Sequence, residues 1–236
     1  MNLMKGKRVL DIETLKQIPL FAVLSDEQLK ILTPEFKPMT VPRGGIILKQ
    51  GEENHTVYVI IDGKIKVTRN SKDGRESIIT IQGPNDLVGT MSVYEPCINF
   101  INSVAISKTE LVSLDLKIFR DLLASNPKFN EQFIRLLTAK MNLGNEQLSN
   151  VVFSDVTGRV AKVLDFLTEK FGSPAAEGTH VRHELTQEEL AHYVGSSRET
   201  VNKALSDFST EGWLRLGSRR VLVLDRSKLK QRAERG

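Results

Sequence analysis

The stretch from Leu185 to Phe208 reads LTQEELAHYVGSSRETVNKALSDF, and it decides the fold of the C-terminal part of the chain. It opens with a capping box, in which Thr186 and Glu189 begin a helix. Gly195 then permits a tight turn into a second helix that begins at Arg198. The apolar residues of both helices recur on their inward faces: Leu190, Val194, Val201, Leu205 and Phe208. This spacing predicts a helix-turn-helix.

The outward face at the start of the second helix carries side chains that could read DNA. A recognition helix meets base edges near its N-terminus, where we expect exposed Arg198, Glu199, Asn202 and Lys203. Arg can pair with guanine through two hydrogen bonds, Glu can accept from cytosine N4, and Lys can reach guanine or a phosphate. Hydroxyls near the two helix N-termini could hold phosphates together with the backbone amides there: Thr186, Ser197 and Thr200. Simple packing of a helix pair around a glycine turn is the alternative.

Downstream of this motif we expect a hairpin with a charged tip. Two short β runs, 213–216 and 221–224, flank a turn that contains Arg219 and Arg220. These arginines would lie on a wing that can follow the DNA backbone. From Trp213 to the C-terminus the chain has eight Lys and Arg and two acidic residues, although its formal net charge is only +4. This local surplus suits phosphate contacts, and a solvated basic tail is the alternative interpretation.

Upstream, between about residues 40 and 115, short β-rich runs alternate with turn residues. The runs are 45–49, 56–61, 64–68, 77–81, 103–106 and 111–114. Asp62-Gly63 and Asp73-Gly74 lie between such runs as tight-turn signals. Ser25, with Gln28 three residues later, caps a short helix in front of them. The pattern predicts an antiparallel β-barrel or roll covered by a helix.

A long helix is predicted from Pro127 to Phe153, because no proline interrupts the stretch between them. Its apolar residues recur close to heptad spacing: Phe133, Leu137, Met141, Leu148 and Val152. Burial of this seam against the barrel is one possibility, and pairing with the same helix of a second chain is the commoner one. Asp155 then caps a further helix that reaches Glu169, and residues 171–178 read as a loop. The domains predicted are 1–125, 126–153 and 154–236.

Two motifs in these segments resemble a known family. Residues 153–159, FSDVTGR, and residues 194–201, VGSSRETV, are similar to the hinge-helix and recognition-helix motifs of the superfamily of the cyclic-AMP receptor protein and the fumarate-nitrate reduction regulator (Crp/Fnr). The order of parts agrees over nearly the whole chain. The resemblance implies an α+β fold with a cyclic-nucleotide-binding-like β-roll, a dimerisation helix and a C-terminal winged helix-turn-helix. It also implies a homodimeric transcription regulator, a palindromic DNA site and contact with RNA polymerase.

The resemblance carries over to individual base readers. Arg198 and Glu199 match the positions of the family's main base readers. Lys203 stands where the receptor branch has a second arginine, and Lys is a point charge without the planar fork of Arg. The outer bases of the half-site therefore do not follow from the resemblance.

The family's effector pocket has lost its two gripping residues in this chain. The family holds the ribose of a cyclic nucleotide with a Gly-Glu pair and the phosphate with an arginine. Gly89 remains, but Thr90 stands for the glutamate and Asn99 for the arginine. An unpaired buried phosphate would cost about 3 to 5 kcal/mol, so we expect no ordinary cyclic-AMP binding. On the long helix the purine-contacting positions are Gly144, which would admit close packing, and Asn145, which could donate hydrogen bonds.

The sequence offers few residues that could bind an iron–sulfur cluster, haem or a metal ion. Cys97 is the only cysteine, which excludes a four-thiolate iron–sulfur cluster and an intramolecular disulfide. The neighbours of Cys97 in the sequence include no cation that would lower the pKa of its thiol, so a structural role is favoured over a redox role. Haem could use His55 with a second ligand, but a histidine in such a polar loop is more often exposed. The other histidines have no carboxylate or thiolate partners at metal spacing, so no metal is assigned: His180, His183 and His192.

The sequence lacks the features of secreted proteins, membrane proteins and enzymes. Residues 1–10 have no apolar core of signal-peptide length, and no stretch is long and apolar enough to cross a bilayer, so we expect a cytoplasmic protein. We expect no enzyme, because the pocket region has no paired nucleophile and base and no phosphate-binding loop occurs. Two alternatives to a ligand-controlled regulator stay open: a constitutively DNA-binding regulator and a haem- or redox-responsive one.

Overall fold

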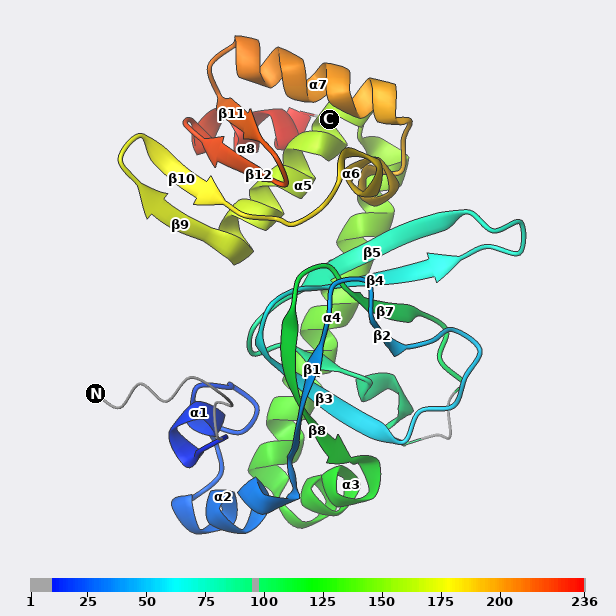
Figure 1. Ribbon diagram of the computed structural model, residues 1–236, viewed down its shortest axis with the longest axis vertical. Coiled ribbons are helices and arrows are strands. Elements are labelled where there is room, and N and C mark those ends of the chain that lie inside the picture. Colours follow the sequence, from blue (N-terminus) through cyan, green and yellow to red (C-terminus); the bar gives the residue numbers. More distant parts are fainter. Residues whose placement is uncertain (1–9, 95–97, 236) are drawn as a thin grey trace.

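The computed structural model describes residues 10–94 and 98–235. The other helices and the strands lie along one long helix, α4 (Pro127–Phe153), as Figure 1 shows. The helices are α1 (Ile12–Lys16), α2 (Asp26–Leu32), α3 (Leu116–Ser125), α4 (Pro127–Phe153), α5 (Val156–Phe171), α6 (Gln187–Val194), α7 (Arg198–Thr210) and α8 (Arg226–Arg235), with the 3-10 turns η1 (Thr33–Glu35) and η2 (Thr90–Ser92). The strands are β1 (Lys37–Val41), β2 (Ile46–Leu48), β3 (Thr56–Asp62), β4 (Ile65–Asn70), β5 (Glu76–Gln82), β6 (Leu87–Val88), β7 (Asn102–Ala105), β8 (Thr109–Asp115), β9 (Gly172–Ala175), β10 (Gly178–Val181), β11 (Leu214–Gly217) and β12 (Arg220–Val223).

The predicted β-roll is confirmed and consists of two four-stranded antiparallel sheets. Their strand orders are β1-β8-β3-β6 and β2-β7-β4-β5. Gly63 and Gly74 have φ of +92° and +84°, the left-handed conformation that the tight turns require. The first sheet packs on α1, α2, α3 and the first half of α4 around an aromatic cluster, in which Phe119 meets Phe133 edge-on at 5.4 Å between ring centroids.

The long helix is confirmed at both ends, but the predicted seam divides into two faces. Asn126 caps the helix by accepting a hydrogen bond from Phe129 N, and Pro127 is its first residue. Phe133 is buried in the roll and Leu137 packs partly buried against it, so assigning these two to a free seam was wrong. The other three residues of the predicted seam are exposed, and Ile134 lies exposed on the same face of the helix: Ile134 (56%), Met141 (68%), Leu148 (69%) and Val152 (71%). We call these four residues the α4 stripe.

The C-terminal part has a small sheet of order β11-β12-β10-β9 that packs with α5 to α8 around one core. As predicted, Asp155 caps α5, and it accepts from Gly158 N at 2.7 Å. The interpretation of residues 171–178 as a loop was wrong, because 172–175 form β9 and pair with β10. The small residues of this hairpin have weak β propensity, and it forms because β12 offers β10 a strand to pair with.

The basic C-terminus is a helix rather than a solvated tail. Arg226 of α8 forms ion pairs with Asp165 at 2.5 Å and with Glu169 at 2.9 Å, and Arg232 pairs with Asp155 at 2.5 Å. The N–H of Gly158, together with the Arg232 guanidinium, lowers the pKa of the Asp155 carboxyl. Part of the local positive charge therefore compensates α5 and its cap. Among the residues that the structure describes, no helix combines the length and the hydropathy of a membrane span.

Candidate nucleic-acid interface

The helix-turn-helix is formed by α6, the turn at Gly195, and α7. Thr186 and Glu189 make the predicted capping box, in which the Thr186 hydroxyl accepts from Glu189 N and Glu189 accepts from Thr186 N. Gly195 has φ of +69°, which a side chain would disfavour. The inward residues are all buried, as predicted: Leu190, Val194, Val201, Leu205 and Phe208.

Three of the four predicted base readers lie exposed on the outer face of α7. Arg198, Glu199 and Lys203 are exposed, while Asn202 is partly buried. The structure adds a residue that the sequence patterns did not single out. Gln187, at the first position of α6, accepts hydrogen bonds at its Oε1 from Arg198 Nη2 and Asn202 Nδ2, both at 3.3 Å. The two helices therefore share one polar cluster at the N-terminal end of α7.

The predicted phosphate-binding hydroxyls are held by the helix caps. Thr186 caps α6, and Ser197 caps α7 by accepting from Thr200 N at 3.2 Å. The hydroxyls of Ser197 and Thr200 also lie 2.9 Å apart. The caps thus place these hydroxyls beside the free amides of the first helical turns, where a phosphate can bind.

The predicted wing is the hairpin of β11 and β12. Arg219 and Arg220 are exposed at its tip, and Arg219 has φ of +55°, as a tight hairpin turn requires. The backbone N–H of Glu184 donates to Arg219 O at 3.0 Å. The wing is therefore tied to the segment that leads into α6.

The start of this segment contains a histidine whose neutral form the fold requires. His183 is 3% exposed, and its Nδ1 accepts from Leu185 N at 3.1 Å. Burial lowers the pKa of the His183 imidazole to about 4. A proton at Nδ1 would break the hydrogen bond as well as bury a charge.

We expect acid to destabilise the protein through His183. Between the ordinary pKa of 6.5 and the folded value of about 4 the unfolded state binds more protons, so stability falls as pH falls through this range. At about 1.4 kcal/mol per pH unit the loss from this group approaches roughly 3 kcal/mol by pH 4. Urea unfolding at pH 7, 6 and 5 measures it. The matched variant His183→Asn keeps an acceptor for Leu185 N without a titrating ring, and an equal loss in this variant would contradict the assignment.

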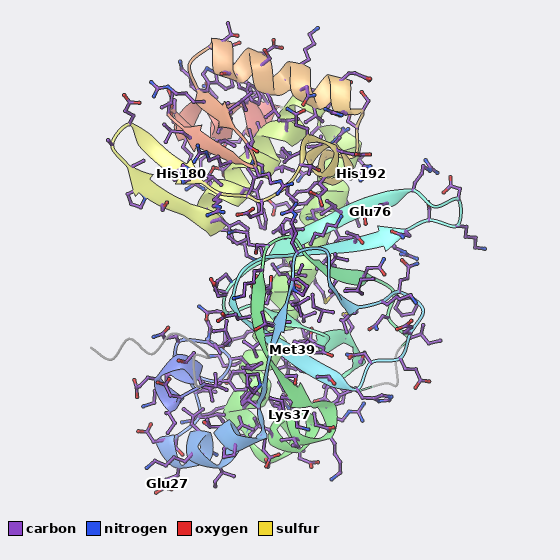
Figure 2. The ribbon with its side chains drawn as sticks, in the orientation of Figure 1. Glu27, Lys37, Met39, Glu76, His180 and His192 are labelled. Atoms are coloured by element: carbon purple, nitrogen blue, oxygen red, sulfur yellow. The ribbon has the colours of Figure 1, made fainter. Side chains whose placement is uncertain are left out.

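The helix-turn-helix also packs directly on the β-roll. Lys66 of β4 lies 2.8 Å from Glu76 of β5 and 3.1 Å from Glu189 of α6. His192 of α6 lies beside Glu76 as well, at 3.8 Å (Figure 2). Burial opposes ionisation of Glu189, but the Thr186 N–H and Lys66 outweigh it and lower the pKa of Glu189. The same carboxylate therefore caps α6 and joins it to the roll.

In the candidate effector pocket Thr90, which stands where the family has a glutamate, is hydrogen-bonded to α4. Gly89 has φ of +84°, and a Cβ there would meet Thr56 O at 2.5 Å. Thr90 is 4% exposed, and its hydroxyl accepts from Lys140 Nζ at 3.3 Å, while Lys140 also donates to Leu87 O at 3.0 Å. Desolvation lowers the pKa of the Lys140 ammonium to about 8. The sequence patterns did not single out Lys140.

The other candidate pocket residues lie elsewhere or are engaged. Asn99 is buried, and its amide donates to Lys49 O at 3.3 Å, so it braces a loop. Gly144 and Asn145 line a groove of about 1340 Å³ between α4, α5 and β5, which Gly89, Thr90 and Asn99 do not line. A Cβ on Gly144 would meet no atom of this chain within 4 Å. The predicted close packing at Gly144 therefore has no partner within one chain.

The candidate cofactor ligands do not converge. The His55 side chain is 73% exposed, as expected of a loop residue, and its Nε2 lies 3.4 Å from Glu53. Cys97 lies outside the described residues. Within residues 10–94 and 98–235 no group of three or more His, Cys, Asp or Glu could hold a metal ion.

Two family models match the chain, one over each half. The cyclic nucleotide-binding domain matches residues 38–126, and the Crp-like helix-turn-helix domain matches residues 158–232. The CRP-like cAMP-activated global transcriptional regulator of Mycobacterium tuberculosis is 39% identical over 221 residues, which cover 94% of this chain and 99% of the relative. The cyclic AMP receptor protein of Thermus thermophilus is 29% identical and covers 92% of this chain and 97% of the relative.

Solved structures share the fold. FixK2 from Bradyrhizobium japonicum has a TM-score of 0.75 and 18% identity, over 83% of this chain and 96% of its own. A CooA mutant from Carboxydothermus hydrogenoformans has a TM-score of 0.74 and 24% identity, over 96% of this chain and 98% of its own. Both similarities cover more than four fifths of this chain.

Proposed function

The chain belongs to the Crp/Fnr family of DNA-binding transcription regulators, and from this we propose that it acts as a homodimer on a palindromic DNA site. The observation that carries the proposal is the α4 stripe. Four large apolar side chains, Ile134, Met141, Leu148 and Val152, are more than half exposed along one face of a 27-residue helix. A second copy related by a two-fold axis would bury each stripe against the other.

Two chains related in this way would present two copies of α7 to DNA. We assign base reading to Arg198, Glu199, Asn202 and Lys203, which cluster at or near the exposed N-terminal end of α7. Phosphate contacts fall to the capped helix ends and the wing tip: Thr186, Ser197, Thr200, Arg219 and Arg220. The half-sites would then lie about one helical turn apart, roughly 34 Å between centres.

One guanidinium joins the end of α4 to the turn that precedes the recognition helix. Arg159 donates from Nη1 to Ser154 O, at the end of α4, at 2.8 Å. It also donates from Nε to Val194 O, at the end of α6, at 2.9 Å. A displacement at the end of α4 would therefore reach the turn before α7. We assign to this contact the control of spacing between the two recognition helices.

We infer that this chain differs from its relatives in its effector. The relatives named above are a cAMP-activated regulator and a cyclic AMP receptor. In this chain the pocket offers the hydroxyl of Thr90 where the family has a carboxylate, and that hydroxyl already accepts from Lys140 of α4. The roll and α4 are thereby joined without a ligand. This supports regulation without ordinary cyclic AMP, and it favours the alternative of a constitutively DNA-binding regulator.

We expect cyclic AMP to leave DNA binding unchanged. Asn99 donates to Lys49 O, and the segment from Thr90 to Ala105 has no Lys or Arg to pair with a buried cyclic phosphate. Lys140, the cation beside Thr90, is already engaged by Leu87 O and the Thr90 hydroxyl. Fluorescence anisotropy with a labelled operator, with and without millimolar cyclic AMP, measures the effect. The expected change in Kd is less than twofold. A tightening of tenfold or more would show that cyclic AMP is the effector.

A haem- or redox-responsive regulator is less well supported, because the His55 side chain is 73% exposed and its Nε2 lies 3.4 Å from the Glu53 carboxylate. The absorption spectrum of the purified protein tests this alternative directly, since bound haem gives a Soret band. Contact with RNA polymerase and a place in the cytoplasm belong to the proposal as properties expected of a bacterial-type transcription regulator. No catalytic activity is part of it.

A further inference from the structure

Gln187 lies between the two helices at the point where the candidate base readers begin. Its Oε1 receives Arg198 Nη2 and Asn202 Nδ2, each at 3.3 Å. Arg198 and Asn202 are four residues apart and therefore share one face of α7. One carbonyl oxygen on α6 thus joins two side chains that face the predicted DNA position.

The chemistry of this contact suits a residue that positions Arg198. An arginine reads guanine through a planar fork, and its long side chain loses much rotamer freedom when the fork is fixed. The guanidinium has five N–H donors, so one bond to Gln187 leaves the others for guanine O6 and N7. The amide of Gln187 is uncharged, so it orients the guanidinium without neutralising it. A carboxylate at this position would still accept from Arg198, but it would place a negative charge beside the DNA phosphates.

We propose that Gln187 is a specificity-determining positioning residue, which holds Arg198 and Asn202 in the geometry that reads one base pair of each half-site. This inference rests on the proposed function, namely that α7 reads DNA. Gln187 is exposed at the first position of α6, outside the buried core, so its replacement leaves the helix-turn-helix intact.

The test compares sequence discrimination rather than affinity alone. For each variant, Kd is measured for the operator and for the same DNA with the base pair that Arg198 reads replaced. That pair is the position where Arg198→Ala loses discrimination. We expect Gln187→Ala to lower the ratio of the two Kd values five- to tenfold and to leave non-specific binding and its salt dependence unchanged.

Two further variants separate positioning from direct contact. Gln187→Glu keeps an acceptor for Arg198, so we expect it to weaken binding to both DNAs and retain the ratio. In the Arg198→Ala background, Gln187→Ala is expected to have no further effect on the ratio, because the residue that it positions is gone. The control Glu188→Gln, an exposed change in the same helical turn, is expected to tighten binding to both DNAs equally.

Three results would overturn the inference. One is an unchanged ratio in Gln187→Ala. Another is a uniform loss of affinity with a shallower salt slope, which would make Gln187 a phosphate contact. The third is a loss of ratio that persists in the Arg198→Ala background. Failure of the proposed function is a separate observation, since the unmodified protein would then show no sequence preference at all.

Discussion

Replacing Leu148 by Glu is expected to convert the proposed dimer to monomers and to weaken operator binding by about two orders of magnitude or more. Leu148 is 69% exposed in the middle of the α4 stripe, between Met141 and Val152. Burying one such side chain contributes about 1.5 to 3 kcal/mol, and a symmetric dimer contains it twice. The substitution removes this contribution and places two carboxylates close together. A monomer also loses the gain of 10² to 10⁴ that comes from engaging two half-sites at once, by the usual order of magnitude.

Analytical ultracentrifugation and operator binding together measure this result. Ala139→Glu is the matched control, because it adds the same charge to the same helix at an exposed position away from the stripe. The control is expected to stay dimeric and to bind the operator normally. If Leu148→Glu remains a dimer at micromolar concentration, the α4 stripe is not the dimer interface.

Replacing Arg198 by Ala is expected to cost about 1 to 3 kcal/mol of operator binding and to relax the sequence preference at one base pair of each half-site. Arg198 is exposed at the first position of α7, and it is held there by Gln187. Its loss removes a bidentate contact to guanine and leaves most phosphate contacts in place. Non-specific DNA binding should therefore change much less than operator binding.

Arg220→Ala is the contrasting control for this prediction. Arg220 lies at the wing tip, where it would contact phosphate, so its loss should weaken binding to all sequences alike and reduce the salt slope by about one. Competition assays with single-base operator variants distinguish the two patterns. If Arg198→Ala keeps full discrimination at every position, α7 does not read DNA as we propose.

Local sequence signals predicted the elements of the DNA-binding part well. The capping box at Thr186, the cap at Asp155 and the proline that starts α4 each depend on residues within four positions, and each is found in the structure. These signals act through the first amides of a helix, so they need no knowledge of distant packing. The turn glycines of the roll were also predictable, because a tight turn is likewise set by neighbouring residues.

What the sequence did not reveal depends on contacts between distant segments. The α4 seam splits because α3 and the roll cover Phe133 but not Met141, which heptad spacing cannot distinguish. The basic residues of α8 are partly neutralised by α5, some sixty positions away in the chain. The roles of Lys140 and Gln187 could not be predicted, because a lysine in a long helix and a glutamine after a helix cap carry no local sequence signal. Their meaning comes from Thr90 and Arg198, which only the fold brings beside them.

The central claim is that two copies of this chain read an inverted repeat in DNA. Repeated selection of sites from a random duplex library, followed by native mass spectrometry of the enriched complex, tests it most directly. We expect an inverted repeat with half-site centres about 10 base pairs apart and two chains on each duplex, obtained without added cyclic AMP. Enrichment of a single unrepeated site with one chain bound, or no enrichment at all, would contradict it.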